Sequence, residues 1–208
     1  MSLFKRKYTE RKVTCVHCGR THTLRKYFAK EYYLDGMPKL PSEQLLAQYA
    51  VCECGAFIYP TASFNPVSAE TIQSPEYQKA LQLPHNECIL ALSNITFPNS
   101  LLGALEVLHI HYNPDALHRC LSCVQHPNAV MQSFDGRKLP QINRPKGIFE
   151  YDADLCEIDL LRQAGEWGKC LEKIQEHRNR EFPPVTPKYQ AFLDYEEMLV
   201  QQQDNRLR

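Results

Sequence analysis

The sequence predicts an α+β chain in which a small N-terminal zinc ribbon is followed by an α-helical domain of antiparallel hairpins. Two close cysteine pairs lie within the first 60 residues, among β-branched and aromatic residues that favour strands. After residue 76, apolar residues recur at helical spacing instead. Residues 60–75 are rich in Pro, Ser, Thr and Asn and separate the two patterns. We therefore expect the ribbon at residues 1–62 and the helical domain at residues 76–208.

The N-terminal part predicts short strands and one short helix. Residues 13–34 combine β-branched and aromatic side chains and predict a β-hairpin. Residues 42–48 predict a helix, for which Ser42 is the expected N-cap. Residues 49–51 and 56–59 predict two further strands, one on each side of the second cysteine pair.

The C-terminal part predicts six or seven amphipathic helices. Asn86 is the expected cap of one helix, and further helices begin after Ser100 and at Pro114. Residues 127–149 predict a long irregular loop. The last 60 residues carry three apolar stripes, of which the first ends at Gly165. Short connections between these helices predict antiparallel hairpins.

Composition excludes several classes of protein. Charged residues make up 23% of the chain and hydrophobic residues 43%, and 24 Lys and Arg balance 24 Asp and Glu, which is typical of a soluble globular protein. No apolar stretch approaches the roughly 18–20 residues of a membrane span, and the N-terminus does not resemble a secretory signal. We therefore expect a cytoplasmic protein without a membrane partner. In a reducing compartment, an odd count of nine cysteines favours metal binding over disulfides.

The two cysteine pairs predict one structural Zn²⁺ ion. Its expected ligands are Cys15, Cys18, Cys52 and Cys54, because zinc prefers four thiolates or imidazoles in a tetrahedron. A glycine directly follows each pair and allows the backbone to turn tightly there. Since four thiolates leave no open coordination position, the site is expected to be structural and not catalytic.

Three variations on this site stay open at the level of sequence. Iron could replace zinc, and His17 or His22 could replace one sulfur. A redox role for Cys15 and Cys18 would require a βαβ context, which this segment lacks. Nearby cations could offset the negative charge of four thiolates around the metal: Lys12, Arg20, Arg25 and Lys26.

A second group of metal-ligand residues lies between residues 109 and 126. Its candidate ligands are His109, His111, Cys120 and Cys123. A metal with an open position there would make the chain a metalloenzyme. The alternative is a helical core, because Cys120 shares a helix face with leucines and a valine. Three other cysteines also fall in apolar stripes and are expected to be packed: Cys88, Cys156 and Cys170.

The charge is unevenly distributed along the chain. Residues 1–60 hold ten Lys and Arg against five Asp and Glu, and basic residues there alternate with aromatic ones. Such a surface can hold phosphates and stack bases, so nucleic acid is a candidate partner. The candidate contacts are Lys5, Arg6, Lys7, Arg25 and Lys26. The alternative is a solvated sheet face, or two halves of opposite charge that attract each other.

Recognised catalytic motifs are absent from the sequence. It contains no P-loop, no dinucleotide-binding glycine motif, no His-Glu-x-x-His and no Gly-x-Ser-x-Gly, and we therefore name no catalytic residue. An acidic stretch contains Asp152, Asp154, Glu157 and Asp159. We expect it to form the first turn and the solvent face of a helix, where the helix dipole favours negative charge.

Three stretches of the chain carry a shared pattern: Val13-Thr14-Cys15-x-x-Cys18-Gly19, Tyr49-Ala50-Val51-Cys52-x-Cys54-Gly55-Ala56 with Phe64, and Leu160-Leu161-Arg162-Gln163-Ala164-Gly165-Glu166-Trp167-x-x-Cys170-Leu171. These stretches resemble an uncharacterised group of bacterial proteins that have an N-terminal zinc ribbon and a tetratricopeptide-like helical region. In the helical stretch, Gly165 corresponds to the turn glycine, Trp167 to the aromatic residue and Cys170 to the usual alanine. The resemblance covers about residues 13–64 and 150–203, and the second cysteine pair has one intervening residue where the group has two. The resemblance implies zinc and a helical scaffold, and no reaction.

Together these observations predict a zinc-stabilised cytosolic scaffold or adaptor whose helical domain binds a protein or peptide. The alternatives are a nucleic-acid-binding ribbon with a helical accessory domain and a metalloenzyme that uses the second His and Cys cluster.

Overall fold

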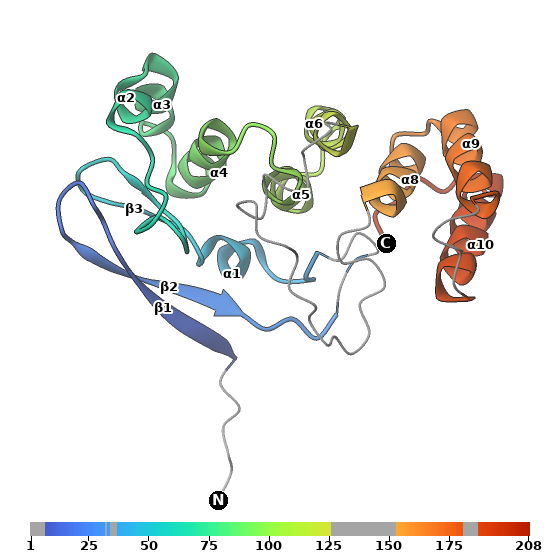
Figure 1. The fold of residues 1–208 in the computed structure, drawn as a ribbon, viewed down its shortest axis with the longest axis horizontal. Coiled ribbons are helices and arrows are strands. Elements are labelled where there is room, and N and C mark those ends of the chain that lie inside the picture. The colour runs from blue at the N-terminus through green and yellow to red at the C-terminus, as the bar shows by residue number, and fades with distance from the viewer. Residues whose placement is uncertain (1–6, 32, 34–36, 126–152, 181–186) are drawn as a thin grey trace, which may run out of the picture. The chain divides into compact units, whose positions relative to one another are not determined.

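The computed structural model describes residues 7–31, 33, 37–125, 153–180 and 187–208 (Figure 1). The described residues form nine helices and two small antiparallel sheets, so the chain is of the mixed α+β class. They group into two compact units. Unit 1 contains Met1–Lys30 and Pro38–Pro98, and unit 2 contains Glu31–Met37 and Asn99–Arg208. The expected connector at residues 60–75 lies inside unit 1, and the expected loop at 127–149 lies outside the described residues.

Unit 1 begins with the predicted hairpin. Strands β1 (Tyr8–Thr14) and β2 (Thr21–Tyr27) pair in antiparallel register, with Tyr8 opposite Tyr27 and Thr14 opposite Thr21. The second predicted pair is also present, as β3 (Ala50–Val51) and β4 (Phe57–Ile58). Each pair of strands is joined by the turn that carries one cysteine pair, so the strands fix where those turns lie.

The helices of unit 1 are α1 (Ser42–Leu46), α2 (Ala69–Gln73), α3 (Pro75–Ala80) and α4 (His85–Thr96). The expected caps Ser42 and Asn86 are wrong, because both residues lie inside the first turn and the N-cap positions are Pro41 and Pro84. Helices α2 and α3 are instead capped by serines, since the side chains of Ser68 and Ser74 accept the N–H groups of Thr71 and Tyr77. Helix α2 lies in the segment that composition predicts as a connector.

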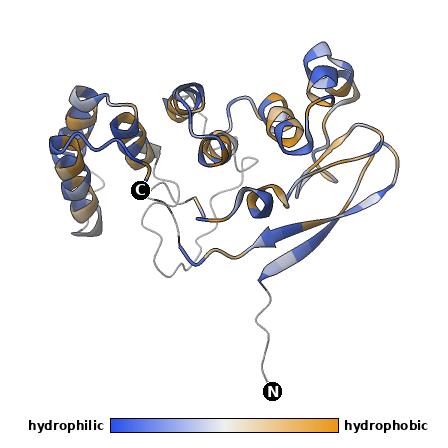
Figure 2. Cartoon of the chain, turned by 180° about the vertical axis from the view of Figure 1, so that it is seen from behind, coloured by the Kyte–Doolittle hydropathy of each residue, from blue (hydrophilic) through white to orange (hydrophobic). Residues whose placement is uncertain are grey.

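Unit 2 consists of helices, all of them near the predicted stripes: α5 (Leu101–Ile110), α6 (Pro114–Gln125), α8 (Ala153–Gln163), α9 (Trp167–Arg178) and α10 (Pro187–Gln201). Each helix packs against the next, and α10 also packs against α8. One core cluster centres on α5 and α6, and the other on α8, α9 and α10. Most helices carry both hydrophilic and hydrophobic residues, whereas β1 and β2 are mostly hydrophilic (Figure 2).

The turn between α8 and α9 explains why the apolar stripe breaks at Gly165. This glycine has a φ of +72°, a left-handed conformation that only glycine adopts at low cost. Its N–H donates to the carbonyl of Arg162, and the N–H of Glu166 donates to the carbonyl of Leu161. This is the Schellman arrangement, which ends a helix and satisfies its last carbonyls. The predicted end of the first apolar stripe at Gly165 is therefore confirmed.

The helices of the described residues are all too short or too polar to cross a membrane.

Candidate metal centre

The first cysteine pair lies in a tight turn that closes β1 onto β2. The N–H of Cys15 donates to the carbonyl of Arg20, and the N–H of Gly19 donates to the carbonyl of Cys15, both at 2.8 Å. Gly19 has a φ of +74°, which gives the reversal directly after Cys18. The turn therefore holds Cys15 and Cys18 close together, and its backbone is fixed by these two hydrogen bonds.

The second pair is built in the same way between β3 and β4. The N–H of Cys52 donates to the carbonyl of Ala56, and the N–H of Gly55 donates to the carbonyl of Cys52, again at 2.8 Å. Gly55 has a φ of +85°. Although only one residue separates Cys52 from Cys54, this turn also ends at a glycine in the left-handed conformation. Both cysteine pairs therefore lie in the tight turns that the following glycines predict.

The two turns bring four sulfur atoms together. Cys15 Sγ lies 3.6 Å from Cys54 Sγ, Cys18 Sγ lies 3.4 Å from Cys52 Sγ, and all four sulfurs lie within 4.8 Å of one another. These distances exceed the roughly 2.05 Å of a disulfide. Four sulfurs at about 2.3 Å from a tetrahedral Zn²⁺ would lie about 3.8 Å apart. The residues present therefore fit one tetrahedral metal ion.

The four thiols differ in exposure and in acidity. Cys15 and Cys52 are buried, whereas Cys18 and Cys54 are exposed. The backbone N–H of Arg20, followed by the Cys52 thiol, lowers the pKa of Cys18 to about 7. Burial raises the pKa of Cys52 to about 12 and also raises that of Cys15. A metal that binds here must displace protons from the buried thiols, so its affinity increases with pH.

Tyr77 on α3 stabilises the second turn through hydrogen bonds to its backbone. Its side chain is completely buried; its hydroxyl donates to the carbonyl of Gly55 at 3.0 Å and accepts the N–H of Phe57 at 2.8 Å. Burial raises the pKa of Tyr77 to about 12, so the hydroxyl keeps its proton at neutral pH. Sequence reasoning missed this residue, because no local pattern connects a tyrosine on a later helix with a cysteine turn.

The segment after β4 supports the first turn. The hydroxyl of Ser63 lies 3.2 Å from both the N and the O of Thr14, and His17 Nε2 lies 2.9 Å from the carbonyl oxygen of Val67. The ring of His17 is therefore used in a bond to the backbone. Within the described residues, the group of candidate ligands around the metal position consists of the four cysteines and includes neither His17 nor His22.

Two of the four cations predicted near the site, Arg20 and Arg25, form ion pairs. Arg20 forms an ion pair with Glu53, the residue between Cys52 and Cys54, and so links the two turns. This contact, first through its hydrogen bond, lowers the pKa of Glu53. Arg25 forms an ion pair with Glu10 at 3.2 Å and lies over the ring of Tyr8. Arg20 is therefore the cation that is best placed to offset the negative charge of the four thiolates.

The candidate nucleic-acid contacts do not gather on one face of the hairpin. Arg25 and Lys26 are neighbours on β2, and successive side chains of a strand point to opposite faces. Arg25 shares its face with Glu10 and Tyr8, whereas Lys26 shares its face with the buried Leu24. Lys7 is exposed before β1, and Lys5 and Arg6 lie outside the described residues.

The structure does not bring the second group of candidate ligands together. Of the described residues, no three among His109, His111, Cys120 and Cys123 offer ligand atoms close enough to share a metal. His109 packs against the ring of Tyr33, and Cys120 and Cys123 are buried in the core of α5 and α6. His111 is exposed at the end of α5. The three packed cysteines are buried as expected: Cys88, Cys156 and Cys170.

The acidic stretch before and within α8 differs from the expected solvent face. Asp159 is 1% exposed and Glu157 is 9% exposed, so the expectation is wrong for both; Asp152 lies outside the described residues, and nothing is described of the side chain of Asp154. Asp159 forms an ion pair with the fully buried Arg162, and Glu157 pairs with Lys173 on α9. The spacing of three residues between Asp159 and Arg162 is the signal that could have revealed this pair.

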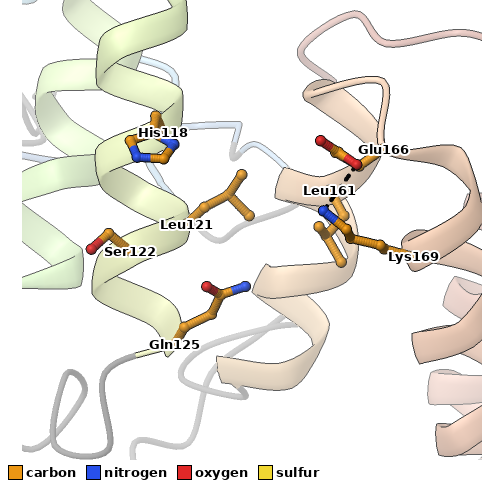
Figure 3. A pocket seen from close by; sticks show the side chains of 7 residues that line it. All are labelled: His118, Leu121, Ser122, Gln125, Leu161, Glu166 and Lys169. Atoms are coloured by element: carbon orange, nitrogen blue, oxygen red, sulfur yellow. Dashed lines mark ion pairs between the residues drawn. The ribbon is translucent and has the colours of Figure 1, made fainter.

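Unit 2 also contains a groove of about 560 Å³ (Figure 3). Its floor is apolar, with Leu121 from α6 and Leu161 from α8. One wall carries polar side chains of α6, and the other carries Glu166 and Lys169, which form an ion pair at 3.1 Å. The polar residues on the α6 wall are His118, Ser122 and Gln125. This mixture suits a ligand with both apolar and polar groups.

Comparisons of the chain with models of protein families, with curated proteins and with solved structures find no match.

Proposed function

We propose that the chain binds one Zn²⁺ ion through Cys15, Cys18, Cys52 and Cys54, and that this ion is structural. The observation that carries the proposal is the convergence of the four sulfur atoms within 4.8 Å from two turns of the same construction. Zinc would connect β1 and β2 to β3 and β4, which otherwise form separate sheets. Because such sites form with the fold, metal binding would contribute directly to the stability of unit 1.

A titration of the metal-free chain tests this site. Cobalt(II) added to four thiolates produces intense charge-transfer and visible bands of tetrahedral geometry, and an equivalent of zinc should displace it. Weak absorption bands, typical of octahedral cobalt(II), would contradict a four-sulfur site. Iron as the resident metal would give a red, redox-active protein when the chain is purified from cells grown without added zinc.

We further propose that the helices of unit 2 form a scaffold that binds a protein or peptide. The resemblance to zinc-ribbon proteins with a tetratricopeptide-like region supports this role, and so does the groove between α6 and the α8–α9 corner. Its apolar floor and polar walls match an extended peptide that inserts one apolar side chain between polar neighbours.

A peptide-display selection on the whole chain tests the scaffold. Ser122 is exposed on the groove wall, so Ser122→Trp should fill the groove without entering the core and should weaken selected peptides at least about tenfold. The matched control is Glu172→Trp, at an exposed position of α9 outside the groove, which should bind as the wild type does. Equal binding by both variants would contradict a role for the groove.

A further inference from the structure

The interior of unit 2 contains a charged cluster that none of the proposed functions uses. Arg162 on α8 is fully buried, and its Nε donates to Glu196 Oε2 on α10 at 2.8 Å. Its Nη2 donates to Asp159 Oδ1. Two carboxyl groups therefore share one guanidinium in a water-poor site. If both were ionised, the cluster would carry an excess negative charge.

The same guanidinium also holds the segment that follows α10. Arg162 Nη1 donates to the carbonyl oxygens of Asp204 and Arg206, both at 2.9 Å. We call residues 204–208 the C-terminal strap. Within it, the carboxylate of Asp204 pairs with Arg206 and Arg208, so the strap is folded on itself. Arg162 is thus the point at which α8, α10 and the strap meet.

One atom of this cluster lacks a partner. Within the described residues, no group donates a hydrogen bond to Glu196 Oε1, although the side chain of Glu196 has no exposure to solvent. An ionised carboxylate with an unsatisfied buried oxygen is far less stable than a neutral carboxyl group in the same place. The geometry therefore favours a proton on Glu196 while the cluster is closed.

The groups around Glu196 offset only part of this cost. From α8 it faces Asp159 and Arg162, and from α9 it faces the thiol of Cys170, whose pKa is raised to about 12 by burial and then by the Glu196 charge. Other titratable or charged groups of this region include His177 on α9, two turns beyond Cys170, the pair of Glu157 on α8 and Lys173 on α9, Tyr112 before α6, and Asp204, Arg206 and Arg208 of the strap. On α10 itself, Asp194 and Glu197 are engaged by Arg178.

We propose that Glu196 is a proton-operated switch that controls the C-terminal strap: the strap is seated on Arg162 when Glu196 is protonated, and ionisation of Glu196 releases it. Release lets water reach Oε1 and the guanidinium, which removes the penalty for the excess charge. The strap opens and the helices stay packed, because the strap is held to Arg162 by hydrogen bonds, whereas α8, α9 and α10 share an apolar core.

The direction of the pH dependence follows from proton linkage. Burial, followed by the Asp159 charge, raises the pKa of Glu196 from 4.5 to about 8, and Arg162 offsets only part of this. Between these two values the closed state holds a proton that the open state has lost. The closed state is therefore fully favoured below about pH 4.5 and loses stability as the pH rises through about 8, with opening increasing about tenfold per pH unit.

Hydrogen exchange of the strap amides, corrected for the intrinsic effect of pH, measures this opening on the whole metal-loaded chain. Between about pH 5.5 and about pH 7.5, opening in the wild type should increase about 100-fold. Glu196→Gln should make the opening nearly independent of pH. The matched control is Glu197→Gln. Glu197 follows Glu196 on α10 and forms an ion pair with Arg178 at 2.7 Å, so this variant should keep the pH dependence of the wild type.

The proposal would be overturned if strap opening in the wild type did not depend on pH, or if Glu196→Gln kept the pH dependence of the wild type. Should Glu196→Gln fail to fold, the carboxyl carbon of Glu196 in wild-type protein decides the question by NMR. A titration midpoint near pH 8 supports the switch, and a midpoint below about pH 5 overturns it.

Discussion

At the scale of single residues, Tyr77 shows how a side chain far along the chain determines the shape of a cysteine turn. Its hydroxyl is bonded both to the carbonyl before Ala56 and to the N–H after it, so it fixes the backbone on which Cys52 and Cys54 stand. Groups that orient metal ligands without touching the metal commonly affect affinity strongly. Tyr77 is therefore expected to matter for the metal as well as for packing.

We predict that Tyr77→Phe lowers the free energy of unfolding by about 1–3 kcal/mol, because it leaves the N–H of Phe57 buried without an acceptor. Zinc affinity, measured by competition with a chromophoric chelator, should fall about tenfold. Tyr8→Phe, a change on the half-buried end of the β1–β2 hairpin, should leave both quantities near wild type. An unchanged zinc affinity in Tyr77→Phe would show that the second turn holds its shape without this hydroxyl.

At the scale of elements, sequence patterns predict helices and turns better than they predict helix caps. The helices of unit 2 begin and end near their apolar stripes, and glycine marks the turn after α8, because periodicity and a left-handed backbone are local properties. The caps at Ser42 and Asn86 are wrong, because each helix begins directly after a proline, at an N-cap position without a side-chain cap hydrogen bond. Helix α2 was missed because five residues are too few to show a period.

Two glycines next to the same turn should respond in opposite ways to alanine. Gly165→Ala forces an L-residue to a φ of +72° and should destabilise unit 2 by about 1 kcal/mol. Gly168→Ala lies on helix α9 in open space and should stabilise the unit by up to about 1 kcal/mol. Urea unfolding followed by circular dichroism measures both. Effects of the same sign would contradict the assigned end of α8.

At the scale of the whole molecule, the four-cysteine site and the charged cluster belong to different compact units. The four cysteines were predictable from their spacing, whereas the extent of unit 1 was not. Composition placed a boundary at residues 60–75, yet Tyr77 and Ile89 are buried inside unit 1. The small sheets have few large aliphatic residues, and helices pack against them: α1 against β2, and α4 against β4. The Asp159–Arg162 pair has a local spacing, but the contacts of Arg162 with Glu196 and Asp204 span more than 30 residues, which no local pattern reveals.

Metal removal should therefore affect the two units unequally. After zinc is removed with a strong chelator, hydrogen exchange in β1–β4 should accelerate at least about tenfold, because the free energy of metal binding is part of the folding of unit 1. The amides of α8, α9 and α10 should keep their protection, since their core contains no metal ligand. Equal loss of protection in both units would contradict this division.

The claim that four cysteines hold one structural zinc ion is tested by the metal content of the chain. Native mass spectrometry of protein purified without a metal-chelating tag should show one zinc in the wild type and in Cys88→Ala, which changes a buried cysteine of α4. Cys52→Ser should show none at low micromolar concentration. A wild-type chain without metal, or a Cys52→Ser chain that keeps its zinc, would contradict the claim.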